Sequence, residues 1–301
     1  MELRHLRYFV AVAEAGSLTV AAEKRLHTAQ PSLSRQIRDL EYEVGVPLLT
    51  RSVHGVELTA AGQVFLDHAR LALTQAEAAI EAARRVAQPE KSRFALGFLT
   101  GQEIDWLPEA MRILRDELPN IEVAVTSDYS PVLAESLTRG KLDLAFMRRE
   151  AGTADLSYKV VTQEALVVVL PSDHRLAKHD RIDLAKLEGT PFVNVSDTAP
   201  ELLKIIDGYI RASKLPIATV HEADNIVMAV SLVASTRGFA LLPGYITNFL
   251  PWSVVSRPVR GTPPMIDLVI GYHKANASPI LAKFISRLGD LTKRGAKAMP
   301  L

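Results

Sequence analysis

The sequence predicts an α/β protein in three parts: an N-terminal winged helix-turn-helix domain, a long linker helix and a C-terminal two-lobed α/β domain. Three observations predict this fold class. Two short amphipathic helical patterns joined by a polar turn lie within residues 17–41. An apolar pattern of helical spacing then runs without proline from residue 59 to about residue 87, and strand and helix patterns alternate from residue 92 onward.

Composition limits the class of protein. The chain has 301 residues, of which 48% are hydrophobic and 23% charged, so it is long enough for two or more globular domains and is not disordered. It has no cysteine, which excludes a disulfide framework, a thiolate metal site and a cysteine nucleophile. The first residues predict an amphipathic helix instead of a signal peptide, and no apolar run reaches membrane-spanning length. We therefore expect a cytoplasmic protein without a membrane partner.

Residues 17–41 predict a helix-turn-helix. The first helix is expected to begin at the N-cap Ser17, and its small alanines allow a second helix to approach closely. The second helix has Pro31 in its first turn and an apolar stripe on one face. Its opposite face carries polar and cationic side chains, namely Ser32, Ser34, Arg35 and Arg38. Such a face suits the major groove of DNA, whereas the alternative is a plain helical hairpin whose charged face meets water.

These N-terminal residues resemble the DNA-binding domain of the LysR-type transcriptional regulators. The motifs that carry the resemblance span residues 1–62 and include Leu6-Arg7-Tyr8-Phe9, Gly16-Ser17-Leu18-Thr19, Gln30-Pro31-Ser32-Leu33-Ser34-Arg35-Gln36-Ile37 and Gly45-Val46-Pro47-Leu48-Leu49. The resemblance implies DNA contacts by Gln30, Pro31, Ser34 and Arg35. Side-chain geometry allows Arg35 to pair in a two-pronged manner with guanine and Gln30 with adenine. The wing is expected at residues 45–58. Within it, we place Arg51 near a phosphate or in the minor groove.

One departure from the family pattern lies in the first helix of the motif. Three residues separate Ala22 from Leu26, where the family usually has two. We therefore expect a longer turn or a bulge at the end of this helix.

The charge of the N-terminal segment is balanced. Residues 1–60 contain seven Lys or Arg and seven Asp or Glu, and the whole chain has a net charge of +1. Such a domain makes few phosphate contacts, so a single copy is expected to bind DNA weakly. A dimer that reads two half-sites is then needed for useful affinity.

Residues 59–88 predict one long helix. Apolar residues recur at helical spacing from Phe65 to Ala83, and a charged segment with a proline follows at 88–92. A core helix is the alternative, but the charged break indicates a helix outside both flanking domains. In the family, this linker helix pairs antiparallel with that of a second subunit. The resemblance thus implies a homodimer or homotetramer that binds an interrupted inverted repeat in double-stranded DNA and contacts RNA polymerase.

The C-terminal part predicts two small doubly wound units. Their strands are expected at residues 93–98, 121–125, 142–147, 166–171, 191–195 and 239–243. The strand 266–272 and the helix 279–288 are expected to return to the first unit. This arrangement resembles the periplasmic-binding-protein-like effector domain of the same family, on motifs such as Gly140-Lys141-Leu142-Asp143-Leu144-Ala145 and Gly238-Phe239-Ala240-Leu241-Leu242-Pro243.

These patterns set the predicted domain boundaries. The winged helix-turn-helix domain covers residues 1–58, the linker helix 59–88 and the effector domain 92–301. Within the effector domain, lobe I is formed by 92–162 and 268–301, and lobe II by 163–267.

Candidate effector residues follow the predicted strands, because ligands of open α/β units bind beyond the carboxyl ends of the strands. They are Thr100, Gly101, Gln102, Ser130 and Arg148 on lobe I, and Asn194, Ser196 and Asn225 on lobe II. Hydroxyls, amides, a helix N-terminus and an arginine suit a small carboxylate. Arg148 is the principal candidate, against the alternative of a solvated or ion-paired arginine, and Arg149 is expected to point the other way.

Within the family, the chain looks most similar to regulators of aromatic-acid catabolism, of the phenylpropionate or cinnamate, benzoate or muconate type. That resemblance implies that Ser130 and Arg148 contact the effector. Gly101 stands where this branch often has a serine, so one hydroxyl is missing, and Thr100 or Gln102 replaces it or the effector differs.

The sequence lacks three motifs that are typical of enzymes. There is no Gly-x-Ser-x-Gly elbow, no phosphate-binding glycine loop and no His-Glu-x-x-His, so we expect neither an enzyme nor a bound metal or cofactor. His174 and His179 lie near Asp173 and Asp180, but a solvated loop accounts for them. A ligand-sensing or solute-binding protein without DNA function is the rival hypothesis, against which the missing secretion signal and the helix-turn-helix count.

Overall fold

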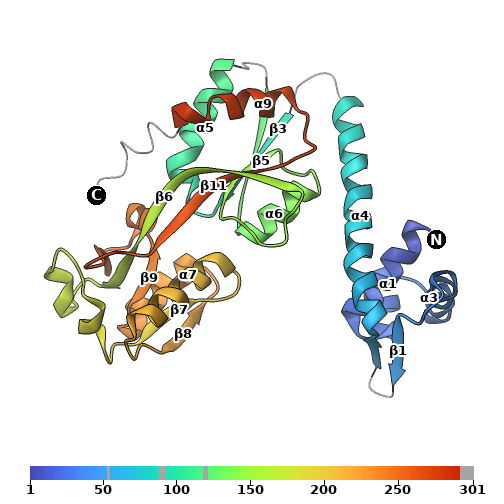
Figure 1. Cartoon of the computed structure of the whole chain (residues 1–301), viewed down its shortest axis with the longest axis horizontal. Coiled ribbons are helices and arrows are strands. Elements are labelled where there is room, and N and C mark those ends of the chain that lie inside the picture. The colour runs from blue at the N-terminus through green and yellow to red at the C-terminus, as the bar shows by residue number, and fades with distance from the viewer. Residues whose placement is uncertain (53–54, 88–92, 118–120, 292–301) are drawn as a thin grey trace. The chain divides into compact units, whose positions relative to one another are not determined.

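The chain forms two compact units, residues 1–87 and 88–301 (Figure 1). The computed structural model describes residues 1–52, 55–87, 93–117 and 121–291. Within these ranges, none of the helices combines the length and apolarity that crossing a bilayer requires. Each unit has its own hydrophobic core.

The N-terminal unit is a winged helix-turn-helix followed by a long helix. Its elements are α1 (Leu3–Ala15), α2 (Leu18–Val20), η1 (Ala21–Leu26), α3 (Gln30–Val44), the antiparallel hairpin of β1 (Leu49–Ser52) and β2 (Gly55–Leu58), and α4 (Ala60–Ala87). Ser17 caps the motif as expected, since its hydroxyl accepts a hydrogen bond from the Val20 N–H at 3.4 Å. The apolar stripe of α3 is fully buried, and the Phe9 and Phe65 rings join α1 to α4 edge to face at 5.2 Å.

The expected bulge in the first helix of the motif takes the form of a π-helix, η1. A π-helix holds more residues per turn than an α-helix, so it accommodates the extra residue between Ala22 and Leu26. Ala21 and Ala22 remain fully buried, and His27 ends the helix in the left-handed region with φ of 48°. The insertion therefore leaves the close packing of the motif intact.

Glu41 ties the second helix of the motif, α3, to the wing. Its Oε1 accepts hydrogen bonds from the backbone N–H groups of Leu48 at 2.8 Å and Leu49 at 2.9 Å. Gly62 lets α4 pass close to the same segment, because a Cβ there would lie 2.0 Å from the carbonyl oxygen of Leu48. The orientation of the wing thus depends on one carboxylate and one glycine.

The C-terminal unit is built on a mixed seven-stranded sheet through which the chain passes between two lobes. The strand order is β10-β6-β11-β5-β3-β4, with β9 also paired to β6. The strands are β3 (Arg93–Leu99), β4 (Glu122–Asp128), β5 (Leu144–Met147), β6 (Leu156–Pro171), β9 (Ala240–Pro243), β10 (Val254–Pro258) and β11 (Met265–His273). The 16-residue β6 pairs with β11 as far as Ala165 and with β9 and β10 from Leu166. It is therefore the structural bridge between the lobes.

Lobe I has helices on both faces of its strands. Its helices are α5 (Glu103–Glu117), α6 (Ser130–Thr138) and α9 (Pro279–Ser286). Residues of α5 and α9 share one core cluster with β3 and β5, and α6 packs in a second cluster with β5. The return of β11 and α9 to this lobe was predicted and is confirmed, since β11 pairs antiparallel with β5.

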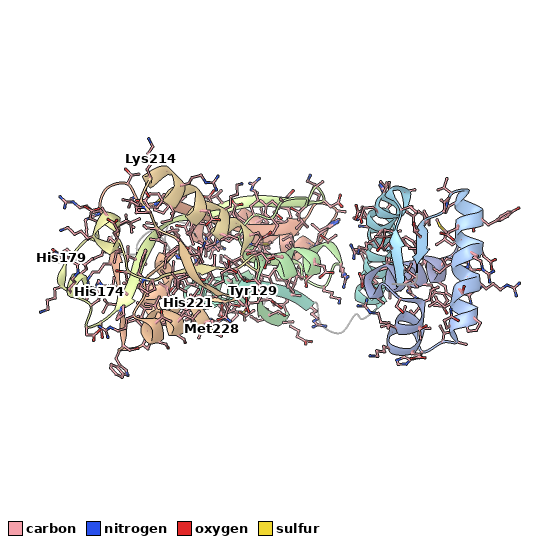
Figure 2. The ribbon with its side chains drawn as sticks, turned by 90° about the horizontal axis from the view of Figure 1, so that it is seen from below. Tyr129, His174, His179, Lys214, His221 and Met228 are labelled. Atoms are coloured by element: carbon pink, nitrogen blue, oxygen red, sulfur yellow. The ribbon has the colours of Figure 1, made fainter. Side chains whose placement is uncertain are left out.

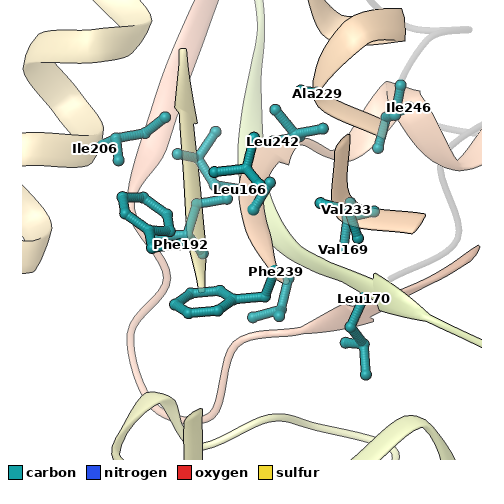
Figure 3. Close-up of a cluster of buried hydrophobic side chains, with 14 of the residues drawn as sticks. Leu166, Val169, Leu170, Phe192, Ile206, Ala229, Val233, Phe239, Leu242 and Ile246 are labelled. Carbon is teal, nitrogen blue, oxygen red and sulfur yellow. The ribbon is translucent and has the colours of Figure 1, made fainter. Parts of the chain in front are cut away.

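Lobe II has a core between its strands and two helices (Figure 3). Its further elements are the parallel pair β7 (Phe192–Val195) and β8 (Thr219–Ala223), the helices α7 (Pro200–Ser213) and α8 (Ile226–Thr236), and the 3-10 helices η2 (Arg175–Lys178), η3 (Leu184–Leu187) and η4 (Gly244–Phe249). Phe192 and Phe239 pack at 5.0 Å in the centre of this core. β8, β10 and the first half of β6 were not predicted, because these segments mix polar and apolar residues and gain their strand form from neighbouring strands.

Glu41→Ala is expected to destabilise the N-terminal unit by about 1–3 kcal/mol, because two buried N–H groups of the wing lose their acceptor. Calorimetric or circular-dichroism melting measures the loss. Glu43→Ala, an exposed change on the same helix, is the matched control and is expected to cost under about 1 kcal/mol. Equal effects of the two changes would contradict this role of Glu41.

Candidate functional site

The first candidate surface is the polar face of α3. Pro31, Ser32, Arg35 and Arg38 are exposed, and Gln30 is half-buried at the start of the helix. The Arg35 side chain is 79% exposed, and its nearest anionic atom among the described residues is Asp39 Oδ2 at 3.9 Å. Because an exposed pair at this distance is weak, the Arg35 guanidinium is available to a base edge or a phosphate.

Ser34 and Arg51 are the two predicted DNA-contact residues that this face does not include. Ser34 was expected on the exposed face, but it is only 8% exposed, so that expectation was wrong. It follows Leu33 and precedes Ile37 on the helix, which places it at the border of the buried stripe. The side chain of Arg51 in the wing lies outside the described residues.

The second candidate site is a cavity in the C-terminal unit between the two lobes. Its volume of about 150 Å³ is roughly ten times what a single water needs, which suits a small organic molecule. Five of the eight predicted effector residues line it: Thr100, Gly101, Ser130, Arg148 and Asn225. Much of the remaining lining is apolar or aromatic, including Leu99, Val195, Leu202, Ile226, Tyr245 and Phe249. A cavity with a mostly apolar wall and a few polar groups is typical of a binding site for a small molecule.

Arg148 lies at this cavity as one partner of a buried ion pair. Its Nη2 lies 2.5 Å from Glu164 Oε2, and the two side chains are 5% and 1% exposed. Glu164 is on β6, next to the point where this strand changes lobes, and its other oxygen accepts a hydrogen bond from Gln102 Nε2 at 2.8 Å. Arg148 is therefore ion-paired, as the alternative interpretation predicted. Its Nη1, however, is buried and has no hydrogen-bond partner among the described residues.

Ser130 and Asn225 lie at the N-terminal ends of α6 and α8, and both residues line the cavity. The Ser130 hydroxyl accepts a hydrogen bond from the Arg148 backbone N–H at 2.9 Å, so its own hydrogen remains for another acceptor. Asn225 caps α8 by accepting the Met228 N–H at 2.7 Å. The positive ends of α6 and α8 thus both point at the cavity and favour an anion.

Three predicted effector residues do not line the cavity. Gln102 is fully buried and supports Glu164. Asn194 is 4% exposed, and it bonds Asp207 at 3.0 Å inside lobe II. Ser196 lies behind Thr198, which does line the cavity, with 3.0 Å between the two hydroxyl oxygens. Gln102 and Ser196 follow strands as expected, whereas Asn194 lies within β7, and all three side chains turn into the protein. Arg149 turns away as predicted, 5.1 Å from the Tyr158 ring centre.

The glycine at position 101 is explained by an aromatic wall. A Cβ at Gly101 would lie 2.8 Å from the Tyr245 ring, and the residue has φ of +92°. Tyr245 comes from η4 of lobe II and donates a hydrogen bond to the Thr100 carbonyl of lobe I at 3.1 Å. The Tyr245 ring, which lines this side of the cavity, therefore explains why position 101 is a glycine and has no hydroxyl. Gln102 does not replace the hydroxyl, because its side chain is buried and bonds Glu164.

Glu150 and Glu201 give the cavity an acidic side that the sequence did not suggest. Both line it, Glu150 from the segment after β5 and Glu201 from the first turn of α7. Burial, with the charge of Glu201 second, raises the pKa of Glu150 to about 7. Its Oε1 is buried and has no hydrogen-bond partner among the described residues.

The described residues contain no group of three or more His, Asp or Glu that would hold a metal ion. His174 and His179 flank the 3-10 helix η2, far from the cavity-lining Tyr129 in Figure 2. His174 Nδ1 accepts the Leu176 N–H at 3.2 Å, and Asp173 pairs with Arg237 at 3.0 Å. These residues have local structural partners.

The raised pKa of Glu150 predicts a pH-dependent stability penalty. The penalty is absent below pH 4.5, where both folded and unfolded chains hold the proton, and grows as pH rises to about 7. Glu150→Gln cannot ionise, so its melting temperature relative to wild type should rise between pH 5 and pH 8. After allowance for solvent screening we expect about 1 kcal/mol, or roughly 2–4 °C. Exposed Glu188→Gln is the control, and a Glu150→Gln difference that does not change with pH would contradict the shift.

Comparison with known proteins places both units in one family. The bacterial regulatory helix-turn-helix model of the lysR family matches residues 3–63, and the LysR substrate binding domain model matches residues 87–293. The Hca operon transcriptional activator HcaR of Escherichia coli is 41% identical over 297 residues, which cover 97% of this chain and all of that protein. The regulator CatR of Pseudomonas putida is 30% identical, with 96% of this chain and 99% of CatR covered.

A solved structure agrees with this result. The crystal structure of full-length CbnR complexed with its target DNA is 26% identical, with a TM-score of 0.57, and covers 97% of this chain and all of that one. These relatives are regulators and not enzymes, and the rival hypothesis of a binding protein without DNA function has no support, because the helix-turn-helix and substrate-binding modules both match. The chain belongs to the LysR family of DNA-binding transcriptional regulators.

Proposed function

We propose that this regulator senses a small aromatic carboxylate in the interlobe cavity and controls genes of aromatic catabolism. The observation that carries the proposal is that Arg148 lines a largely apolar cavity and that its buried Nη1 has no hydrogen-bond partner among the described residues. A carboxylate oxygen satisfies this donor, and an aromatic ring fills the space beside Tyr245 and Phe249. The similarity to HcaR and CatR supports a catabolic role.

Thr100, Ser130 and the ends of α6 and α8 supply the remaining contacts in this proposal. Glu164 pairs with Nη2 of Arg148, so Arg148 alone gives an incoming anion only partial charge compensation. The hydroxyls and the two helix N-termini add to it without adding net charge.

On DNA, we propose that Gln30, Pro31, Ser32, Arg35, Arg38 and the wing residue Arg51 form the contact surface of a domain covering residues 1–58. The helix α4 supports a dimer, because apolar side chains such as Leu71 and Ile80 are about half exposed along it. Residues 59–88 would then be the dimerisation helix and 92–301 the effector domain. Dimers or tetramers would read an interrupted inverted repeat and contact RNA polymerase in the cytoplasm.

Effector binding couples to transcription, in this proposal, through the lobes. A ligand that contacts both lobes favours the arrangement in which its contacts are complete. Such a shift changes how subunits associate and therefore how the DNA between half-sites is bent.

The sensor half is tested by thermal-shift and calorimetric binding of phenylpropionates, cinnamates and benzoates to the full chain, with muconate as a non-aromatic comparison. At least one aromatic acid should raise the melting temperature. Arg148→Leu alone leaves Glu164 buried without its partner, which is expected to cost about 3–5 kcal/mol of stability. The double variant Arg148→Leu/Glu164→Gln removes both charges, so it should recover most of that stability yet bind no acid. Unchanged affinity in the double variant would contradict the role of Arg148, and an absence of binding across the panel would contradict the aromatic-acid proposal.

The DNA half is tested with Arg35 variants on an operator selected from a random-sequence pool with the wild-type chain. Arg35→Lys keeps the charge but loses the two-pronged geometry, so non-specific affinity should persist. Specific affinity should fall roughly 10- to 100-fold or more, since each lost base contact is worth about 1–3 kcal/mol in each half-site. Fluorescence anisotropy with specific and scrambled duplexes measures both affinities. Equal losses on the two duplexes would make Arg35 a phosphate contact, and loss of effector binding as well would make it structural.

A further inference from the structure

One part of the interlobe cavity favours an anion. Arg148 lines the cavity, is 4% exposed, and has an Nη1 without a hydrogen-bond partner among the described residues. The helix α6 begins at Ser130, whose hydroxyl accepts the Arg148 backbone N–H, and the first turn of this helix contains no acidic residue. A guanidinium group and the positive end of a helix thus come together on lobe I, where they favour one carboxylate.

The helix N-termini of lobe II that reach the cavity already carry acidic side chains. Glu201 lies in the first turn of α7, and Asp224 directly precedes Asn225, the N-cap of α8. Both acidic residues line the cavity. A carboxylate beside a helix N-terminus offsets the positive end of the helix dipole. These two helix ends therefore attract a ligand anion less than the end of α6 does.

The cavity wall has one cationic side chain and three acidic ones among the described residues. Arg148 is the cation, and it also pairs with Glu164, while Glu150 joins the two acidic residues of lobe II in the lining. Lys204 lies 3.8 Å from Glu201, but its side chain is 78% exposed, so solvent screens its charge. Because the cavity measures only about 150 Å³, a second ligand carboxylate would lie close to acidic groups without a cation of its own.

We propose that the cavity accepts aromatic acids with a single carboxylate and rejects dicarboxylates, and that Glu150, Glu201 and Asp224 repel the second anionic group. This inference rests on the proposed function and narrows the effector to monocarboxylic acids. It separates effectors of the benzoate and phenylpropionate type from muconate, which is a dicarboxylate. Specificity of this kind depends on an unfavourable contact with the wrong ligand, because like charges held together at a partly buried site repel more strongly than in water.

The remainder of an aromatic monocarboxylic acid suits the rest of the wall. Leu99, Leu202, Ile226 and Phe249 offer apolar surface to a ring. A neutral ring substituent brings no charge near the acidic side chains, so it is tolerated where a charged substituent of the same shape is not. Charge, and not size, is therefore the ligand property on which this discrimination depends.

The test compares ligands of equal shape and unequal charge. The probes are benzoate and 3-phenylpropionate, each also with a second carboxylate or with a carboxamide at ring position 2, 3 or 4. Calorimetric titration of the full chain at pH 8, where Glu150 is mostly ionised, measures their affinities. For at least one ring position, the carboxamide should bind about tenfold or more tightly than the dicarboxylate of the same shape.

The double variant Glu150→Gln/Glu201→Gln removes two acidic charges from the wall at nearly constant shape. In this variant the preference for the carboxamide should fall to less than about threefold, through tighter binding of the dicarboxylate. Glu122→Gln/Glu188→Gln is the matched control, because it removes one exposed carboxylate from each lobe outside the cavity lining. It should keep the wild-type preference, and melting curves check that both variants are folded.

The outcomes separate this inference from the proposed function. If dicarboxylates bind the wild-type chain as tightly as their carboxamide counterparts, the rejection of a second anion is wrong while the aromatic-acid sensor stands. The same holds if the preference persists in the cavity variant, or if neither substituted form binds where the parent acid does, since the exclusion is then steric. If neither these probes nor any other acid of the binding panel binds, the proposed function fails, and the inference fails with it.

Discussion

The buried ion pair between Arg148 and Glu164 is the interaction on which the ligand cavity depends. Arg148 follows a central strand of lobe I, and Glu164 lies on β6 beside the point where this strand crosses to lobe II. Gln102, directly before α5, donates a hydrogen bond to Glu164 Oε1, and Ser130, at the start of α6, accepts one from the Arg148 backbone N–H. A buried charge pair is stabilising only when its geometry and hydrogen bonds are nearly complete. Here the Nη1 of the arginine has no hydrogen-bond partner among the described residues, which supports the proposal that the cavity binds a ligand.

The cavity also depends on contacts that join the lobes on either side of this pair. Tyr245 of lobe II bonds to the Thr100 carbonyl, and Asn248 bonds both carboxylate oxygens of Asp105 at 2.9 and 3.0 Å. Gly101 is what allows the tyrosine ring to lie so close. Because the walls come from both lobes, a ligand that fills the space stabilises one arrangement of the lobes, which is the requirement for a sensor. In the N-terminal unit, Glu41 plays the comparable fixing role between α3 and the wing.

Much of the fold could be predicted from the sequence, because helix caps, apolar periodicity and strand patterns are local. The same locality located Thr100, Ser130, Arg148 and Asn225, which follow strands or open helices at the cleft. Glu164 was missed because its role depends on β6 crossing between lobes, although a carboxylate directly before the apolar run 165–171 was a signal. Glu150, Glu201 and Tyr245 could not be found, since only tertiary packing brings them to one cavity. Ser34 and Asn194 were misplaced because the sequence pattern around them did not fix which way their side chains turn on the helix α3 and the strand β7.

The central claim is that Arg148 binds the carboxylate of the effector through its Nη1. The most direct measurement is a crystal structure of the full chain with a bound aromatic acid from the binding panel. The account predicts the carboxylate within hydrogen-bond distance of Arg148 Nη1, with the ring against Tyr245 and Phe249. An acid bound elsewhere in the C-terminal unit, or bound in the cavity with its carboxylate away from Arg148, would contradict it.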